Sequence, residues 1–267
     1  MIEYEQLAKS NAPFMETFKE KALQVIDSGW YILGPELEAF EKEFAEYIGV
    51  KHCIGVASGL DAITLSLESL DLPAKSEVIV AANSYVATVL AIKQAGLKPV
   101  LVEPSSDYNL DVDKIEAHIN PQTKAILPVH LYGYPCHMAK LRALCQEYQL
   151  KMVEDCAQAH GAEFFGKKLG SFGDCNAWSF YPTKNLGCLG DGGAITTDDD
   201  QLAEKCRLLR NYGSKLRYHN LVQGHNSRLD EIQAAFLRIK LASLDKINQH
   251  KKNLAKLYDN YLTDKVV

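Results

Sequence analysis

The chain has 267 residues, 47% of them hydrophobic and 24% charged, and a formal net charge of -5 at pH 7. This length suits one large domain with a substantial core, and the mildly acidic balance gives no electrostatic reason to expect nucleic-acid or membrane binding. The seven cysteines form no C-x-x-C pair and no zinc spacing, and the N-terminus carries no basic region followed by an apolar core. We therefore expect a reduced, cytoplasmic protein that acts on small molecules and binds no metal.

Short apolar runs alternate with longer amphipathic stretches, which is typical of strand–helix units that build a largely parallel sheet. The candidate strands are residues 53–57, 77–81, 99–102, 125–129, 151–154, 177–180 and 194–197. The candidate helices are residues 36–48, 59–70, 86–95, 138–149 and 201–210, followed by one long helix over residues 227–261. The pattern predicts an α/β fold with a mostly parallel seven-stranded sheet that has helices on both faces.

One lysine, Lys184, lies in a short connection rich in hydroxyls and glycine, just after the candidate strand 177–180. A lysine forms an imine with an aldehyde only when its amine is unprotonated and held in place, which a tight connection at the edge of a buried sheet can achieve. Tyr181, three residues earlier, is close enough to donate a hydrogen bond at the same reacting centre, although packing explains it equally well. We hypothesise that Lys184 is the Schiff-base lysine of a pyridoxal phosphate enzyme.

A possible phosphate site lies at residues 57–62, which follow a strand and open a helix, so that free backbone N–H groups would face an anion. Ser58 and Gly59 stand at this point, but a plain N-cap is the more frequent role of such a pair. Ser179 could add a hydroxyl to the same anion. The glycine-rich residues 190–193 lack the end of a Walker loop and precede a strand, which favours a tight turn.

Asp155 ends the apolar run 151–154 at the carboxyl edge of a predicted parallel strand, where α/β folds bind ligands. Opposite a pyridine nitrogen its carboxylate would favour the protonated ring, while an N-cap or an arginine partner explains it equally well. Gln158 could donate to the ring oxygen of such a cofactor or act as the capping-box partner of Asp155. Tyr85, at another strand end, could stack on a planar ring, although ordinary packing is the more frequent role.

Three histidines are candidates for proton transfer because imidazole titrates near neutral pH. They are His130, His160 and His225. Each of them alone is more often a structural or surface histidine.

Taken together, seven ordered segments resemble the DegT/DnrJ/EryC1/StrS sugar aminotransferases, a family of fold-type I pyridoxal phosphate enzymes. The segments are residues 28–35, 57–59, 82–85, 128–133, 154–161, 179–187 and 225–231. The resemblance implies that Lys184 forms the Schiff base and shuttles the proton, and that Asp155 holds the pyridine nitrogen. It also implies that Gln158 contacts the ring oxygen and Tyr85 stacks on the ring, and that the phosphate lies at Ser58, Gly59, Leu60 and Ser179.

The resemblance further implies a homodimer with shared active sites, because Asn226 matches a residue that in this family reaches the phosphate of the neighbouring subunit's cofactor. It predicts a large cofactor-binding domain over residues 1–226. Residues 227–267 would form a connecting helix that leads to a small C-terminal subdomain, and that subdomain is largely absent from this chain.

The substrate is indicated by two of these segments, residues 59–62 and 226–231, which are similar to members that aminate the 3-keto position of nucleotide-linked 6-deoxyhexoses. Members acting at C4 more often carry threonine where Leu60 stands and tyrosine where Ser227 stands. With leucine there, backbone N–H groups would bind the phosphate without that hydroxyl. We therefore expect transfer of an amino group from L-glutamate to C3 of a dTDP-3-keto-6-deoxyhexose, with pyridoxal 5'-phosphate as cofactor.

Three alternative functions stay open beside this one. The first is C4 amination of a dTDP- or UDP-4-keto sugar. The second is sugar 3-dehydration, as in the related sugar 3-dehydratases. Those enzymes carry histidine in place of the lysine, so Lys184 disfavours this function. The third is a non-catalytic protein that senses pyridoxal phosphate or a nucleotide sugar, which has no need of Asp155, Gln158 and Lys184 together.

Overall fold

The centre of the computed structural model, which describes residues 5–216 and 218–262, is a seven-stranded sheet with the strand order β1-β9-β8-β5-β4-β2-β3. The strands are β1 (His52–Val56), β2 (Glu77–Ala81), β3 (Lys98–Val102), β4 (Thr123–Leu127), β5 (Lys151–Asp155), β8 (Cys175–Ser179) and β9 (Gly193–Thr197). Neighbours from β8 to β3 pair in parallel, and β9 runs antiparallel to both of its neighbours. Each predicted strand is confirmed to within two residues at either end.

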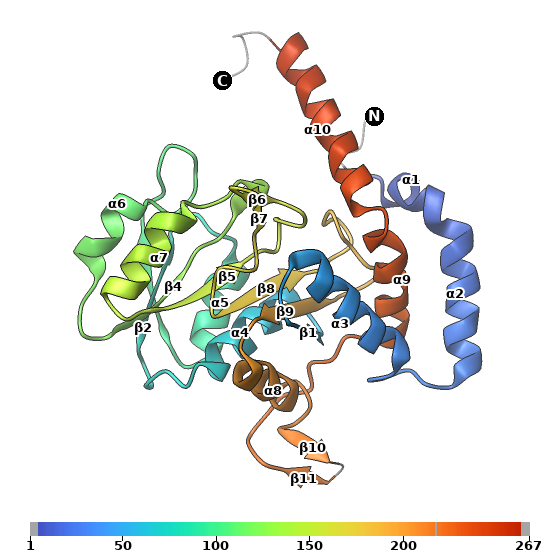
Figure 1. The fold of residues 1–267 in the computed structure, drawn as a ribbon, viewed down its shortest axis with the longest axis horizontal. Helices are drawn as coiled ribbons and strands as arrows, with labels where there is room; N and C mark the ends of the chain where they lie inside the picture. The colour runs from blue at the N-terminus through green and yellow to red at the C-terminus, as the bar shows by residue number, and fades with distance from the viewer. Residues whose placement is uncertain (1–4, 217, 263–267) are drawn as a thin grey trace.

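The helices surround this sheet, as Figure 1 shows. They are α1 (Leu7–Asn11), α2 (Met15–Ser28), α3 (Pro35–Ile48), α4 (Gly59–Ser69), α5 (Val86–Gln94), α6 (Val112–Ile115), α7 (Met138–Glu147), α8 (Asp200–Leu209), α9 (Glu231–Leu241) and α10 (Leu244–Tyr261). Short 3-10 turns lie at Ala12–Phe14, Glu116–His118 and Leu131–Gly133, and two small hairpins pair β6 (Glu163–Phe164) with β7 (Lys167–Lys168) and β10 (Ser214–Leu216) with β11 (His219–Asn220). Helices α3, α4, α5, α7 and α8 are those predicted, whereas α1 and α2 were not expected.

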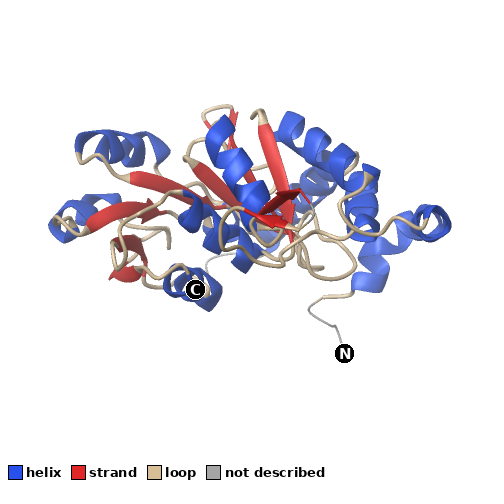
Figure 2. Ribbon diagram, turned by 90° about the horizontal axis from the view of Figure 1, so that it is seen from below, coloured by secondary structure: helices blue, strands red, loops and turns tan. Residues whose placement is uncertain are grey.

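The sheet is buried on both faces, as predicted. Alternate side chains of a strand point to opposite faces, so on β2 Ile79 enters one hydrophobic cluster while Val78 and Val80 enter another. The first cluster contains side chains of α3, α7 and α9, and the second contains side chains of α4, α5 and α8. Figure 2 shows helices on both sides of the strands.

The prediction of one continuous helix over residues 227–261 is wrong. Residues 227–230 lie outside any helix, and α9 ends where the N–H of Ser243 donates to the carbonyl of Lys240, a bond that spans only three residues. Helix α10 restarts at Leu244, whose side chain is fully buried, and its last turns extend away from the rest of the molecule (Figure 1). The break lets Leu244 reach the core, a need that helical periodicity alone does not reveal.

The proposed division into residues 1–226 and 227–267 stays a prediction, and the final residues 263–267 lie outside the described residues. Among the helices that the structure describes, none is long and apolar enough to cross a bilayer. The cytoplasmic location also stays a prediction.

Candidate active site

A cavity of about 420 Å³ lies at the carboxyl ends of strands of the central sheet. Its lining includes the predicted residues after β1 (Ser58, Gly59, Leu60), after β2 (Tyr85), at and after the end of β5 (Asp155, Gln158), and at and after the end of β8 (Ser179, Tyr181, Lys184). These four strands run in the same direction, so their carboxyl ends share one edge of the sheet, which is where open α/β sheets bind ligands. The fold thus brings together every predicted site residue except Asn226.

Asp155 is the last residue of β5 and is only 5% exposed. Its Oδ1 accepts a hydrogen bond from the backbone N–H of Ala157 at 3.0 Å, and its Oδ2 accepts one from the Thr88 hydroxyl at 2.9 Å. Burial raises the pKa of Asp155, although both hydrogen bonds and the charge of Lys184 oppose the rise. No helix begins at Asp155 and no arginine pairs with it in the described part of the chain. The carboxylate therefore keeps acceptor capacity for a ligand.

Lys184 lies in the turn after β8, where its backbone N–H donates to the carbonyl of Tyr181 at 2.8 Å. Its side chain is partly buried, and within residues 5–216 and 218–262 its Nζ makes no hydrogen bond or ion pair. Burial lowers the pKa of Lys184, and the nearby Asp155 carboxylate opposes this shift. A larger share of the amine is consequently unprotonated near neutral pH, as a nucleophilic lysine requires.

The start of α4 forms one end of the cavity. Ser58 is the N-cap of α4, because its Oγ accepts from the N–H of Asp61 at 3.1 Å. The N-cap role that the sequence favoured for this residue is therefore confirmed. The N–H groups of Gly59 and Leu60 have no acceptor inside the helix. A Cβ at Gly59 would lie 2.6 Å from the Cβ of Ser179, so only glycine lets the helix start this close to the end of β8. The result is an open set of N–H donors at the positive end of a helix.

The remaining predicted groups lie around this cavity with exposed side chains or free donors. Tyr85 is 71% exposed and Tyr181 is 52% exposed, so core packing explains neither. The Oε1 of Gln158 accepts from the N–H of Tyr132 at 2.6 Å, which leaves the side-chain NH₂ group of Gln158 to donate. The capping-box interpretation of Gln158 is wrong, because residues 156–162 form turns and no helix.

Asn226 lies outside the cavity. It is exposed and forms an isolated antiparallel bridge with Asn211. Its expected contact with a second subunit's cofactor involves another chain and stays a prediction.

Sequence reasoning missed several residues that line the cavity, among them Thr88, Asp191 and Gly192. Thr88 lies in the first turn of α5, three residues after Tyr85, and a hydroxyl so close to a strand end was a usable signal. Residues 190–192 form a short bent connection before β9, which begins at Gly193, and the pattern did not indicate that this connection faces the cavity.

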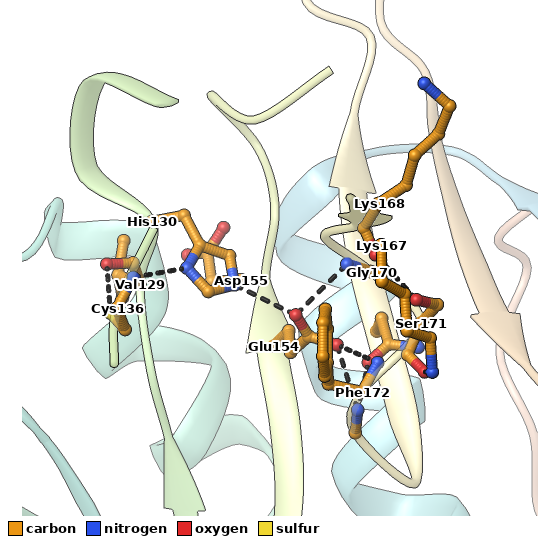
Figure 3. A network of polar contacts seen from close by, with 12 residues as sticks. Val129, His130, Cys136, Glu154, Asp155, Lys167, Lys168, Gly170, Ser171 and Phe172 are labelled. Carbon is orange, nitrogen blue, oxygen red and sulfur yellow. Dashed lines mark hydrogen bonds and ion pairs between the residues drawn. The ribbon is translucent and has the colours of Figure 1, made fainter. Parts of the chain in front are cut away.

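Behind Asp155, on the opposite side of β5, Glu154 is the centre of a buried network (Figure 3). His130 is fully buried and its Nε2 lies 2.9 Å from Glu154 Oε2, while its Nδ1 accepts from the N–H of Cys136 at 3.2 Å. Because Nδ1 accepts, Nε2 carries the hydrogen that His130 donates to Glu154. Three further donors reach the same carboxylate from backbone N–H groups of Gly170, Phe172 and Gly173. Although burial opposes it, these hydrogen bonds lower the pKa of Glu154.

Cys156 lies close to this network, and its Sγ is within 4.8 Å of one ligand atom each of His130 and Glu154. Both oxygens of Glu154 already accept two hydrogen bonds each, so the group forms a structural network with no free carboxylate ligand.

The other two histidines also lie away from the cavity lining. His160 is buried against Trp178, with ring centroids 5.3 Å apart, and burial and the nearby Lys184 lower the pKa of His160 to about 3. It is therefore neutral near pH 7. His225 pairs with Glu68 at 2.8 Å on the surface. His130 and His225 fit the structural or surface interpretation, whereas both ring nitrogens of His160 are buried without a hydrogen-bond partner among the described residues.

Comparison with known proteins supports the resemblance drawn from the motifs. The DegT/DnrJ/EryC1/StrS aminotransferase family matches residues 14–266. A dTDP-3-amino-3,6-dideoxy-alpha-D-galactopyranose transaminase from Aneurinibacillus thermoaerophilus is 50% identical over 97% of this chain and 71% of its own length. A dTDP-3-amino-3,4,6-trideoxy-alpha-D-glucose transaminase from Streptomyces venezuelae is 52% identical over 88% of this chain, which spans 62% of that relative.

A solved structure of S. venezuelae DesV, in complex with a ketimine intermediate, superposes with a TM-score of 0.94. It is 48% identical, and the match covers 96% of this chain and 70% of the DesV chain. The chain belongs to the DegT/DnrJ/EryC1/StrS aminotransferase family.

Proposed function

We propose that this chain carries the cofactor site of an aminotransferase that uses pyridoxal phosphate to transfer an amino group from L-glutamate to C3 of a dTDP-linked 3-keto-6-deoxyhexose. The observation that carries the proposal is that the Lys184 amine, the Asp155 carboxylate and the open start of α4 face one cavity. Two relatives at 50% and 52% identity are named for a 3-amino product linked to dTDP, which supports the substrate class. Since the chain spans 71% and 62% of these relatives, the activity is proposed for the whole protein.

The residues at the cavity fit pyridoxal phosphate in three independent ways. The N–H groups at Gly59 and Leu60 suit a phosphate, because the helix start is open and a side chain at position 59 would collide with Ser179. Each oxygen of the Asp155 carboxylate accepts only one hydrogen bond, so the carboxylate can accept another from a protonated pyridine nitrogen. The amine of Lys184 suits an aldehyde, because burial favours its unprotonated form.

The mechanism assigns one task to each side chain. When bound, the cofactor supplies a ring that spreads the negative charge left on the substrate carbon after a proton leaves. Asp155 would accept a hydrogen bond from the ring nitrogen of the bound cofactor and stabilise its protonated form, and Lys184 would carry the proton that leaves and returns at the reacting carbons. Tyr85 would cover one face of the cofactor ring, and Gln158 would donate to the ring oxygen. Tyr181 donates a hydrogen bond near the reacting carbon.

We further propose that two copies of the protein share their sites, with Asn226 of each copy donating to the phosphate of the other. A mixture of inactive Lys184→Ala and impaired Asn226→Ala proteins should then recover activity after subunit exchange, because each mixed dimer contains one site with both residues intact. If mixing restores nothing while size measurements show that subunits exchange, the shared site is wrong.

The test of the function uses the full-length protein. We expect it to be yellow with pyridoxal phosphate, to lose that colour with L-glutamate and to regain it with a keto-sugar. Incubated with glutamate and either dTDP-3-keto- or dTDP-4-keto-6-deoxyglucose, it should yield an amine at C3 only, identified by NMR. An amine found only at C4 would contradict the proposed amination at C3. A colour unaffected by glutamate would favour the alternative of a non-catalytic protein that senses the cofactor or a nucleotide sugar.

Lys184→Ala should abolish this turnover, because no other amine lines the cavity among the described residues. The matched control is Lys93→Ala, which removes an exposed lysine of α5 and should keep the wild-type rate. More than a trace of activity in Lys184→Ala would contradict the assignment.

A further inference from the structure

The turn that carries Lys184 is held from outside by α9 and α10. After Lys184, every second residue meets a side chain of these helices. The contacts are Asn185 Nδ2 to Asn248 Oδ1 at 2.9 Å, Lys240 Nζ to the carbonyl of Gly187 at 2.7 Å, and the N–H of Leu189 to Gln233 Oε1 at 2.9 Å. From inside, the turn is closed by backbone hydrogen bonds from Lys184 to Tyr181 and from Cys188 to Phe180. The position of Lys184 therefore depends on two helices that are more than 40 residues away in the sequence.

Lys240 is a buried amine with an unusual partner. It is 6% exposed, and no carboxylate among the described residues lies within ion-pair distance of its Nζ. Burial lowers the pKa of Lys240, since a buried ammonium without a counter-charge is costly. An apolar side chain of similar length would fill the same space without that cost. What the amine adds is its hydrogen bond to Gly187.

Gly187 accepts this bond at the tightest point of the turn. A Cβ there would lie 2.4 Å from the carbonyl oxygen of Pro182, so the two sides of the turn are in direct contact. The carbonyl of Gly187 lies outside the sheet, and a buried carbonyl without a donor destabilises the fold. Lys240 supplies that donor and ties the turn to α9.

Asn248 connects the turn to a second loop that lines the cavity. Its Oδ1 accepts from Asn185, and its Nδ2 donates to the carbonyl of His160 at 2.8 Å. His160 belongs to the loop after β5 that also carries Gln158. One amide side chain of α10 thus spans the two loops that bring Lys184 and Gln158 to the cavity. Lys251 adds a second contact from α10, 2.6 Å from Asn185 Oδ1.

We propose that Lys240 and Asn248 are positioning residues that, by holding the turn at Asn185 and Gly187, set where the Lys184 amine lies relative to Asp155. This inference rests on the proposed function of Lys184. A reacting group must be held to within a fraction of an ångström, and small displacements lower rates strongly. The distance from Lys184 to the Asp155 carboxylate also matters, because that carboxylate opposes the lowering of the pKa of Lys184.

A merely structural role for the two residues predicts a different result. Loss of a structural contact lowers the thermal midpoint of the protein and leaves the chemistry of Lys184 unchanged. Loss of a positioning contact changes how fast Lys184 forms a Schiff base with pyridoxal phosphate and the pH at which that Schiff base titrates. These two quantities are read from visible absorbance without any turnover.

The experiment compares Lys240→Met and Asn248→Leu with the wild type in the full-length protein freed of cofactor. Gln249→Leu is the control, because Gln249 is the next residue of α10 and makes its hydrogen bond to Asn253 on the exposed side. On addition of pyridoxal phosphate, we expect both variants to form the Schiff base roughly tenfold more slowly than wild type. The midpoint of its pH titration should move by about one pH unit. Lys240→Arg, which keeps a donor, should recover part of the rate.

The outcomes separate this inference from the proposed function. Borohydride reduction followed by peptide mapping should place the cofactor on Lys184 in every variant. If the wild type forms no reducible bond at Lys184, the proposed function is wrong, and so is the inference that rests on it. If the wild type does so while both variants keep its rate within twofold and its titration midpoint, the inference alone is overturned, whatever happens to their thermal midpoints.

Discussion

Glu154 and Asp155 are neighbouring carboxylates at the end of the same strand, yet they face opposite sides of the sheet and have opposite properties. Glu154 is fully buried and accepts four N–H hydrogen bonds, two at each oxygen. Asp155 is nearly as buried and accepts two hydrogen bonds, one at each oxygen. The pKa of Glu154 is lowered and that of Asp155 is raised.

The difference lies in the number of donors, since both groups suffer from burial. Four N–H donors replace the water that Glu154 loses, and it therefore stays charged as part of the structure. Two donors do not replace that water for Asp155, and the remaining lone pairs face a cavity. A buried carboxylate that is short of donors is costly by itself, and a ligand with its own donor would remove that cost. This contrast supports the proposal that Asp155 belongs to the site, while Glu154 serves the scaffold.

The largest effect that would test the contrast is on activity. Asp155→Asn should lower the rate of amino transfer on the order of 10³-fold, because an amide does not stabilise a protonated ring nitrogen. The rate is measured by 2-oxoglutarate formation from glutamate in the full-length protein. Glu154→Gln, assayed below its unfolding temperature, should keep a rate much closer to wild type. Equal losses in the two variants would contradict the division of roles.

The next effect is on stability. Glu154→Gln replaces a carboxylate with an amide whose NH₂ group would face N–H donors, so we expect a loss of about 3 kcal/mol. For a chain of this size the thermal midpoint should fall by roughly 10 °C. Calorimetry or circular dichroism measures this change. Asp155→Asn serves as the paired control, and a loss in that variant as large as in Glu154→Gln would remove the distinction between the two sites.

The sequence indicated Asp155 far better than it indicated Glu154, and the reason is physical. Asp155 follows an apolar run at a strand end, and that local pattern is visible. Glu154 lies inside the same run, and its donors come from His130 and from residues 170–173, which only the folded chain brings near. Strands and most helices were predictable because their periodicity is local. The break between α9 and α10 was not, because it depends on where Leu244 meets the core.

A smaller effect concerns the dependence of stability on pH in the cofactor-free protein. The pKa of Glu154 is lowered by folding, so its stabilising contribution is present above the unfolded value of about 4.3 and is lost as the pH falls through the folded value. The pKa of Asp155 is raised, so its contribution is present below about 3.9 and is lost as the pH rises through the folded value. Above the folded value, the ionised Asp155 therefore destabilises the cofactor-free fold.

Asp155→Asn should consequently be more stable than wild type at pH 7, by about 1 to 2 kcal/mol, and this advantage should vanish toward pH 4. Glu154→Gln should show the reverse, a deficit at pH 7 that shrinks in acid. Denaturant unfolding at a series of pH values measures both curves. If the two variants differed from wild type in stability with the same sign at pH 7, the number of hydrogen-bond donors would not distinguish the two carboxylates.

The smallest effect comes from Thr88, which supplies one of the two donors of Asp155. Thr88→Val keeps the shape of the side chain and removes the hydroxyl, so the pKa of Asp155 should rise further. A smaller share of Asp155 would then be charged and able to stabilise the protonated ring nitrogen. Binding of pyridoxal phosphate should weaken roughly threefold, which is less than 1 kcal/mol. Thr88→Ser, which keeps the donor, should bind like wild type. Absorbance titrations from pH 6 to 9 measure both, and if valine and serine behave alike, the hydroxyl of Thr88 does not help to keep Asp155 charged.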